Sequence, residues 1–484
     1  MRSAGPHRAR RENASMIDCP RLIVPATLLL LLVAACATLP LSPRVPALPQ
    51  AARVQSSDFI VVTVRNDRRP QAQRAGSTPR GYDQAGAYGI TAEASESVHA
   101  LERAYGLREV SSWPIATLRV HCVVFRVPSA ATKMALIAQL SRDPRVESAQ
   151  PLNEFTTQTA PESVGDAGTE RQPHSVEDSE HSRPEWMPYN DPYAPLQRAL
   201  RDLGVIEAQK ESRGAGVRIA IIDTGVDLDH PDLAGRVIAH RNFVDDDERQ
   251  FLQDRHGTEV AGVIAAVANN GIGIVGIAPD AQLLAYKACW QSPADAAHAV
   301  CNSFTLAQGL EAAILAHADI VNLSLAGPPD PLLASLVRDG ERRGILFTGA
   351  VPEFTAAGFP SAVPGVLAVE SAEDGPRRAQ DLFAPGREIL TLTPGGHYDF
   401  ASGSSLATAE VSGVLALMLA GQGRIRAGSA KQMLTSSARQ TASPGGPALI
   451  NACRALAEAR GRGLCTASRG SIAEDVRTRR PEPR

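Results

Sequence analysis

From residue 187 to residue 457, short continuous apolar runs alternate with segments of helical spacing. The apolar runs have the length of strands and cover Val217 to Ile222, Leu283 to Tyr286, Ile320 to Leu325, Ile345 to Thr348 and Val366 to Val369. The helical patterns cover Gly257 to Val267, Thr305 to Ala316, Pro331 to Arg343 and Ser404 to Leu419. Strands without polar alternation are buried on both faces, so this order predicts an α/β fold with a parallel sheet flanked by helices. Ligands of such sheets bind at the carboxyl ends of the strands.

Length and charge limit the other possibilities. The chain has 484 residues, which is room for two or three domains. Its hydrophobic content of 44% suits ordinary globular domains. The formal net charge of -3 excludes a strongly basic nucleic-acid binder, so no nucleic-acid partner is expected.

Residues 1–35 have the pattern of a signal peptide. Basic residues precede an apolar run that is too short for a comfortable membrane span. The run contains Val33-Ala34-Ala35-Cys36, which resembles a bacterial lipobox. We therefore expect lipidation of Cys36 and an exported, membrane-anchored protein of the bacterial cell envelope, in the outer membrane or the periplasm. An uncleaved anchor or a plain signal peptide is the alternative. A Pro/Ala-rich tether, residues 36–57, follows.

Residues 58–155 are expected to form a small α+β domain. Strand patterns cover Phe59 to Val64, Glu109 to Trp113, Leu118 to Val127 and Val146 to Phe155, and helical patterns cover Ala92 to Tyr105 and Ser129 to Ser141. The order β-α-β-β-α-β is typical of a ferredoxin-like fold. An acidic, polar stretch, residues 156–193, reads as a solvated linker. The larger domain covers residues 194–460, and a charged tail, residues 461–484, is expected to be disordered.

Three short glycine-bearing segments offer the side chains of acyl-transfer chemistry. They hold Asp223 before Thr224-Gly225, His256 before Gly257-Thr258, and Ser405 within Gly403-Ser404-Ser405-Leu406-Ala407. A serine hydroxyl is a poor nucleophile unless an imidazole takes its proton, and the imidazole needs a carboxylate that fixes its tautomer. Chemistry alone does not separate Ser405 from its neighbour Ser404.

These segments resemble the motifs of the subtilisin-like (S8-type) serine proteases, and residues 194–460 resemble the catalytic domain of that family. The family pattern Asp-Thr-Gly-Val-x-x-x-His-Pro-Asp-Leu is met from Asp223, His-Gly-Thr-x-Val-Ala-Gly is met from His256, and the family's Gly-Thr-Ser-Met-Ala has Ser405 at the serine. The resemblance implies a serine endopeptidase with Asp223 as acid, His256 as base and Ser405 as nucleophile. Residues 58–155 resemble the family's inhibitory propeptide. This implies a self-inhibited precursor with its own pro-domain in the active-site cleft.

Asn322 to Gly327 is similar to the family's substrate-binding strand, which usually ends in Ser-Leu-Gly. The resemblance implies that a peptide or protein substrate binds along Ser324, Leu325, Ala326 and Gly327, where an extended peptide would pair as an added strand. Ala326 stands where glycine is usual, and we expect it to narrow the specificity pocket. An ordinary core strand is the alternative.

One departure from the family concerns the oxyanion. The family places an asparagine shortly after the strand predicted to end at Thr348, and its amide is the second oxyanion donor. No asparagine occurs between Asn322 and Asn451. Loss of this donor lowers turnover about 100- to 1,000-fold in subtilisin, the namesake of the family. The hydroxyl of Thr348 or a protonated Glu353 is a candidate substitute.

Two lesser departures lie at Glu259 and Glu410, where the family commonly has histidine. Neither is a position of the Ser-His-Asp triad. They concern local packing more than the reaction.

The cysteines predict disulfides if the protein is exported. Cys289 and Cys301 flank a polar loop, and Cys453 and Cys465 flank a helical segment, so each pair is a disulfide candidate. Reduced thiols are the alternative. No cofactor or metal is required for the predicted chemistry, and the acidic run at residues 245–247 reads as a solvated charge cluster.

Three hypotheses follow. The first is a serine endopeptidase of modest turnover, made as a self-inhibited precursor. The second is a degenerate protease fold that binds peptides or a partner, which the missing asparagine favours and the complete triad opposes. The third is another acyl transfer by the same residues, such as ester hydrolysis.

Overall fold

The computed structural model describes residues 56–67, 89–158, 187–245, 247–291, 298–352, 358–373, 381–440 and 446–461. The predicted signal, the lipidation site Cys36, most of the linker and nearly all of the tail lie outside these residues. No helix among the described residues is both long enough and apolar enough to cross a membrane.

The first part of the chain, residues 56–158, forms the N-terminal unit. Its elements are β1 (Phe59–Arg65), α3 (Ala92–Tyr105), β2 (Arg108–Ile115), β3 (Val120–Arg126), α4 (Lys133–Leu140), β4 (Val146–Pro151) and β5 (Glu154–Thr157), with short 3-10 turns at Ser56–Asp58 and Ala130–Thr132. Strands β1 to β4 make an antiparallel sheet in the order β2-β3-β1-β4. This connection of β-α-β-β-α-β elements is a ferredoxin-like arrangement.

Local signals set the ends of α3. The hydroxyl of Thr91 accepts the N–H of Ala94, which satisfies one free donor of the first turn. The helix ends at Gly106, whose left-handed conformation (φ 64°) suits a residue without a side chain.

The larger unit, residues 187–461, is built on a seven-stranded sheet. Its order is β15-β14-β13-β11-β6-β8-β7, and its neighbouring strands pair in parallel. The strands are β6 (Arg218–Asp223), β7 (Val237–Asn242), β8 (Gln282–Lys287), β11 (Ile320–Leu323), β13 (Leu346–Ala350), β14 (Val366–Ser371) and β15 (Leu382–Ala384). The predicted parallel sheet is confirmed.

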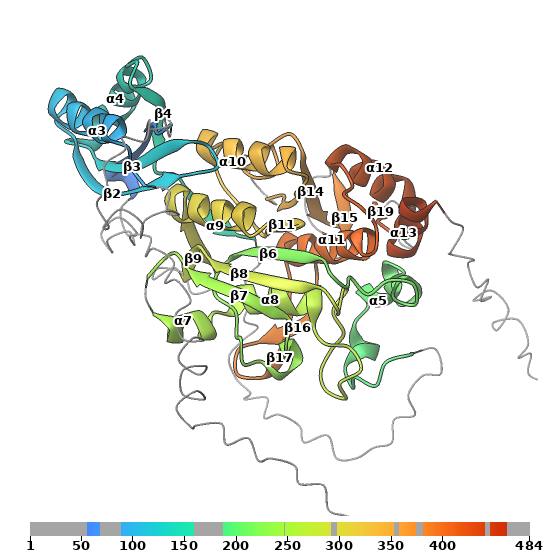
Figure 1. The fold of residues 1–484 in the computed structure, drawn as a ribbon. Coiled ribbons are helices and arrows are strands. Elements are labelled where there is room, and N and C mark those ends of the chain that lie inside the picture. Colours follow the sequence, from blue (N-terminus) through green and yellow to red (C-terminus); the bar gives the residue numbers. More distant parts are fainter. Residues whose placement is uncertain are drawn as a thin grey trace, which may run out of the picture. The chain divides into compact units, whose positions relative to one another are not determined.

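Helices cover both faces of this sheet (Figure 1). On one face lie α8 (Arg255–Ala265) and α11 (Ser404–Leu419), and on the other lie α9 (Ser303–Leu315) and α10 (Pro331–Arg342). Side chains of successive residues in a strand point to opposite faces of the sheet. In β6, Ile221 packs toward α8 and α11, whereas Ile222 packs toward α9 and α10. Both faces are therefore apolar, as the continuous runs predict.

Smaller elements complete the larger unit. They are α5 (Ala199–Asp202), α6 (Val205–Gln209), α7 (Glu248–Gln253), β16 (Ile389–Thr393), β17 (His397–Ala401), α12 (Ala427–Ser437), β18 (Arg439–Gln440), β19 (Ala448–Leu449), α13 (Ala452–Arg460) and 3-10 turns at Ala194–Leu196 and Pro231–Leu233.

A second sheet joins the two units. Its order is β12-β5-β10-β9, with β9 (Cys289–Gln291), β10 (Ala299–Asn302) and β12 (Leu325–Ala326) from the larger unit. Strand β5 of the N-terminal unit lies between β10 and β12 and is antiparallel to both. It continues to Thr157, two residues past the predicted domain boundary at 155.

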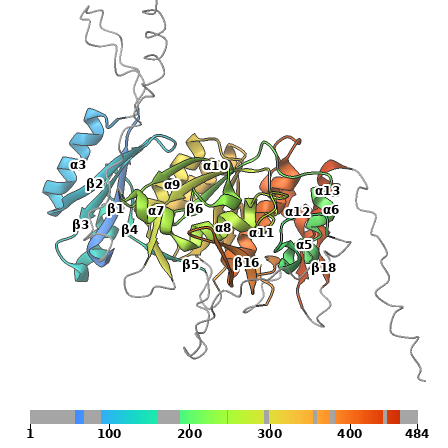
Figure 2. The ribbon, with the colours of Figure 1, turned by 90° about the horizontal axis from the view of Figure 1, so that it is seen from below.

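The N-terminal unit also docks on the ends of α9 and α10, as Figure 2 shows. One oxygen of Asp330 accepts from Nε2 of Gln150 at 2.6 Å, Nδ2 of Asn153 at 2.9 Å and Oγ of Ser303 at 2.6 Å. On α9, Glu311 accepts the N–H of Ala116 at 2.5 Å. The carboxylates of Asp330 and Glu311 therefore accept hydrogen bonds from the N-terminal unit across the contact.

A histidine buried in the N-terminal unit makes its stability pH-dependent. His121 in β3 is 4% exposed, and its Nδ1 has no hydrogen-bond partner among the described residues. Burial lowers the pKa of His121 to about 4, from 6.5 for the free side chain. The unfolded unit therefore binds the proton more readily, so stability present above pH 6.5 is lost as the pH falls toward 4.

We expect hydrogen-exchange protection of β1 and β3 to be lower at pH 5 than at pH 7, after correction for intrinsic exchange. The full loss below both pKa values is on the order of 3 kcal/mol. His121→Leu should remove the difference. His99→Leu, at the exposed histidine of α3, should keep it. Equal protection at both pH values in the unaltered chain would contradict this account.

Candidate active site

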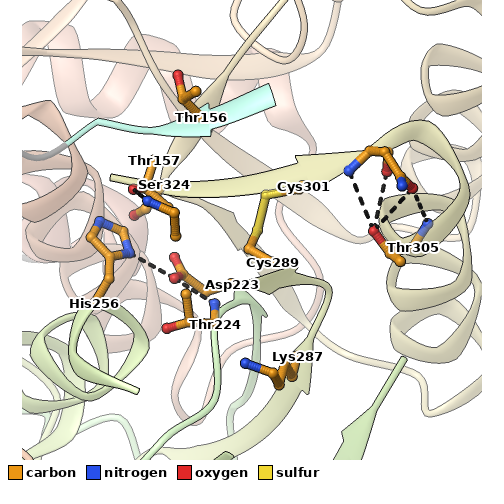
Figure 3. Close-up of a disulfide and its surroundings, with 12 residues drawn as sticks. Thr156, Thr157, Asp223, Thr224, His256, Lys287, Cys289, Cys301, Thr305 and Ser324 are labelled. Carbon is orange, nitrogen blue, oxygen red and sulfur yellow. Dashed lines mark hydrogen bonds and ion pairs between the residues drawn. A yellow bond between two sulfur atoms is a disulfide. The ribbon is translucent and has the colours of Figure 1, made fainter. Parts of the chain in front are cut away.

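Asp223 ends the interior strand β6 and is fully buried. Its Oδ1 accepts the N–H of Thr224 at 2.7 Å and faces Nδ1 of His256 at 2.6 Å. Figure 3 shows this carboxylate and the imidazole side by side at the edge of the sheet. The sequence predicts this location, because the carboxyl ends of parallel strands form the binding edge.

His256 lies in the first turn of α8. Burial opposes the charged imidazolium, but the carboxylate of Asp223 outweighs that cost and raises the pKa of His256. The hydrogen bond at Nδ1 fixes the orientation of the imidazole ring and leaves Nε2 as the nitrogen that can accept a proton.

Two glycines allow β6 and α8 to approach so closely. A Cβ atom on Gly257 would lie 2.4 Å from the carbonyl oxygen of Gly225, and one on Gly225 would lie 2.1 Å from that of Phe251. The hydroxyl of Thr224 accepts the N–H of Gly257 at 2.8 Å. The two glycine-bearing segments are therefore one packed unit, which explains why each needs a residue without a side chain.

Ser405 lies in the first turn of α11 and is fully buried. Its N–H donates to the carbonyl of Gln158 at 3.1 Å. Its Oγ accepts the N–H of Gln158 at 3.0 Å and donates to the carbonyl of Ser324 at 2.9 Å. The positive end of the helix dipole lies behind this N–H, so the position favours an oxygen that gains negative charge.

Ser404 has a different environment. Its hydroxyl donates to the carbonyl of Val351 at 2.9 Å. The two neighbouring serines therefore differ in their partners, since Ser405 contacts Gln158 and Ser404 contacts Val351.

The three predicted catalytic residues come from neighbouring elements, and two of them bond directly. Asp223 and His256 form the short contact described above. Within the described part of the chain, Nε2 of His256 has no hydrogen-bond partner. The hydroxyl of Ser405 is turned to Ser324 instead.

The predicted substrate-binding residues line one side of β5. Leu325 pairs with Thr157 and Ala326 pairs with Thr156. A Cβ atom on Gly327 would lie 2.3 Å from the ring of Phe155, so glycine makes room for that ring. The carbonyl of Ser324 accepts two hydrogen bonds, from the N–H of Gln158 and from the hydroxyl of Ser405. The hydroxyl of Ser324 donates to the carbonyl of Ser405.

The carbonyl oxygen of Gln158 accepts one hydrogen bond, from the N–H of Ser405. Among the described residues no second group donates to this oxygen. The hydroxyl of Thr348, one predicted substitute, contacts Ser412 Oγ at 2.7 Å beneath α11. It is therefore engaged away from Gln158. Glu353, the other predicted substitute, lies outside the described residues.

Sequence reasoning missed a buried ion pair beside the site. Lys287 follows the apolar run of β8, stands opposite Asp223 in the sheet and is fully buried. Its Nζ pairs with Asp254, whose carboxylate also accepts the N–H of Gly225 at 2.7 Å. A lysine at the end of a buried strand and an aspartate two residues before His256 are the signals that could have revealed it.

The two glutamates at histidine positions differ in their partners. Glu259 pairs with Nε of Arg255 at 2.6 Å. Burial raises the pKa of the Glu410 carboxyl well above its usual range, and neither oxygen has a hydrogen-bond partner among the described residues. Glu410 is buried within α11, whereas Glu259 lies in α8 close enough to His256 for the charges of the two side chains to interact.

Cys289 and Cys301 form a disulfide that ties β9 to β10. Cys453, the second residue of α13, is disulfide-bonded, but its predicted partner Cys465 lies outside the described residues, so that pairing stays a prediction. Cys122 is a buried free thiol.

Metal ligands do not converge in the part of the chain that the structure covers. It contains no group of three or more His, Cys, Asp or Glu side chains placed to hold a metal ion. In the acidic run, Asp247 caps α7 by accepting the N–H groups of Arg249 and Gln250, and Asp246 lies outside the described residues.

Known proteins share this fold and these segments. The model of the subtilase family (peptidase S8) matches residues 214–455. Thermitase of Thermoactinomyces vulgaris is 35% identical over 249 residues, which cover 49% of this chain and 86% of thermitase. An intracellular serine protease of Paenibacillus polymyxa is 38% identical over 228 residues, covering 43% of this chain and 68% of that protein.

The solved structures include fervidolysin from Fervidobacterium pennivorans, a keratinolytic enzyme related to subtilisin. It superposes with a TM-score of 0.60 at 21% identity, over 84% of this chain and 61% of fervidolysin. At this identity the likeness concerns the fold. Fold, site and relatives together define a serine endopeptidase, a hydrolase. The chain belongs to the subtilase family.

The buried ion pair yields a stability prediction. Lys287→Met leaves the carboxylate of Asp254 buried without its cation, and we expect the free energy of unfolding to fall by about 3–5 kcal/mol. Urea unfolding followed by circular dichroism measures the loss. As a control, Lys210→Met removes the exposed partner of Glu207, and its cost should stay below about 1 kcal/mol. Equal losses for the two variants would show that the buried pair has no special role.

Proposed function

We propose that the chain is a serine endopeptidase made as a self-inhibited precursor, with Ser405 as nucleophile, His256 as general base and Asp223 as the carboxylate that orients it. One observation carries the proposal: the carbonyl of Gln158 accepts the N–H of Ser405, while Ser405 Oγ lies within 3.0 Å of the Gln158 nitrogen. The chain's own peptide thus occupies the position of a substrate.

The reaction follows from these contacts. Ser405 Oγ turns from Ser324, gives its proton to Nε2 of His256 and bonds to the carbonyl carbon of Gln158. The oxyanion that forms is held by the N–H of Ser405, and Asp223 stabilises the imidazolium. The imidazolium then protonates the leaving nitrogen of Thr159, and the C–N bond breaks. Water, deprotonated by His256, releases Gln158 as a carboxylate and restores the hydroxyl of Ser405.

The N-terminal unit is the proposed inhibitory propeptide. Strand β5 fills the groove between β10 and β12, and the contacts of Asp330 and Glu311 hold the rest of the unit on α9 and α10. The bond cut in processing is then the one between Gln158 and Thr159. After the cut, the unit remains as a tightly bound product until it is removed.

Modest turnover is the second part of the proposal. The support is that the N–H of Ser405 is the one donor to the Gln158 carbonyl among the residues that the structure describes, and that the sequence from Asn322 to Asn451 has no asparagine between its ends. A reading as a degenerate binding protein without catalysis is not favoured, because the relatives are proteases.

We also propose that lipidation of Cys36 anchors the exported protein to the bacterial cell envelope. The support is the lipobox-like sequence Val33-Ala34-Ala35-Cys36. Incorporation of labelled palmitate in the cell should disappear in Cys36→Ser and persist in Cys19→Ser. Labelling that survives in Cys36→Ser would refute the anchor.

Active-site labelling tests the nucleophile. A fluorophosphonate probe should label the purified, self-processed chain once the N-terminal unit has been removed, because it traps a hydroxyl activated by an imidazole. Ser405→Ala should abolish the label, whereas Ser404→Ala, at the adjacent hydroxyl bound to Val351, should retain it. An unlabelled native chain, or a label that persists in Ser405→Ala, would overturn the assignment.

Acid should slow self-cleavage. The imidazole accepts a proton only when neutral, and the pKa of His256 is raised above 6.5 by Asp223 against the opposing effect of burial. We therefore expect the rate constant for appearance of the shorter chain, measured on gels, to decline with acid and to reach half its maximum above pH 6.5. A rate that is constant or increases from pH 8 to pH 5 would contradict the role of His256.

A further inference from the structure

The two walls of the groove around β5 pair with different lengths of the bound strand. On one side, β12 pairs with β5 through Thr157. On the other side, the pairing with β10 runs from Glu154 to Thr156 and goes no further. Ala299, the first residue of β10, therefore stands beside Thr157 beyond the end of the backbone pairing.

A side chain supplies the next contact. The N–H of Ala299 donates to Oγ1 of Thr157 at 3.1 Å. Thr157 is 1% exposed and Ala299 is 2% exposed, so this donor has no access to water while the strand is bound. A hydrogen bond between two backbones forms with almost any residue, but this one requires an acceptor on the side chain of the bound residue, which here is the hydroxyl of Thr157.

We propose that the groove selects peptides with threonine, and next serine, immediately before the residue that supplies the scissile carbonyl, with the N–H of Ala299 as the specificity-determining donor. The inference rests on the proposed function, since it assumes that a substrate binds as β5 does, with the carbonyl of its scissile bond at the position of Gln158. It narrows the substrate class to peptides with a β-hydroxy residue at that position.

The donor is held in place by its own strand. The disulfide between Cys289 and Cys301 ties β10 to β9, and Cys301 lies two residues from Ala299. In Figure 3, Thr157 lies close to this disulfide, with Ser324 and His256 beside it. A rigid N–H cannot move to another acceptor, so a residue without the hydroxyl leaves it buried and unsatisfied.

Neighbouring side chains of the bound strand offer less selectivity. Thr156 is exposed, so its hydroxyl can bond to water. The amide of Gln158 turns back on its own strand and donates to the carbonyl of Thr156 at 3.1 Å. The hydroxyl of Thr157 is the polar side-chain atom of this strand that meets a buried donor of β10.

Valine is the matched probe, because it keeps the shape of threonine and lacks the acceptor. The cost of an unsatisfied buried donor corresponds to roughly a 5- to 150-fold loss in binding or in kcat/KM. Thr156→Val makes the same chemical change one residue away, at the exposed position.

The first experiment does not require catalysis. In the full chain carrying Ser405→Ala, hydrogen exchange of the β5 amides reports how often the strand leaves the groove. Thr157→Val should lower the protection factors roughly 5- to 150-fold. Thr157→Ser should largely preserve them, and Thr156→Val should leave them unchanged. Unchanged protection in Thr157→Val, or an equal loss in Thr156→Val, would overturn the proposal.

The second experiment measures selection during turnover. The self-processed chain, freed of the N-terminal unit, is given the peptide Glu-Phe-Thr-Thr-Gln-Thr, which repeats residues 154–159, and its two single Thr-to-Val variants at the positions of Thr156 and Thr157. Only the change at Thr157 should lower kcat/KM. Equal kcat/KM values would refute the selection. If none of the peptides is cut, the proposed endopeptidase function fails, while hydrogen exchange still decides whether the hydroxyl is recognised.

Discussion

One hydrogen bond, from the backbone N–H of Ser405 to the carbonyl of Gln158, joins the N-terminal unit to the candidate site, and the proposed inhibition depends on it. A helix begins with N–H groups that have no partner within the helix, and α11 begins inside the protein rather than in water. An acceptor must therefore come from elsewhere. In this chain it comes from a segment almost 250 residues earlier, which reaches the helix only because β5 pairs with both walls of the groove.

The electrostatics of the site follow from burial at the edge of a parallel sheet. Strands of such a sheet end side by side, so Asp223 at the end of β6 stands next to Lys287 at the end of β8. Neither side chain reaches water. Each pairs with a residue near the start of α8. Asp223 pairs with His256 in the first turn of α8, and Lys287 pairs with Asp254 just before it. Isolated charges there would be far more costly.

Much of the fold could be predicted because its signals are local. Strand β6 and helix α11 are continuous in the sequence, and α3 carries its cap signals at Thr91 and Gly106. Edge strand β7 was missed because its exposed face interrupts the apolar run. Strand β5 was cut short because its polar residues gain their stability from β10 and β12, which are distant in sequence.

The candidate site shows the same division. The motifs predict Asp223, His256 and Ser405, but the choice of Ser405 over Ser404 required either the family pattern or the contact with Gln158. Lys287 and Asp254 each carry a local signal of a buried charge, but that they pair with each other depends on the register of β6 with β8. Likewise, the hydrogen bond of the Thr157 hydroxyl cannot be predicted locally, because its donor, the N–H of Ala299, lies 142 residues away.

The account depends on the bond after Gln158 being the one presented to Ser405. Sequencing the new N-terminus of the catalytic portion, after the purified full chain has been allowed to process itself, tests that claim most directly. The predicted sequence begins Thr159-Ala160-Pro161. A first cut elsewhere, at any bond between residues 160 and 186, would contradict it, as would a chain that stays whole while its serine is reactive.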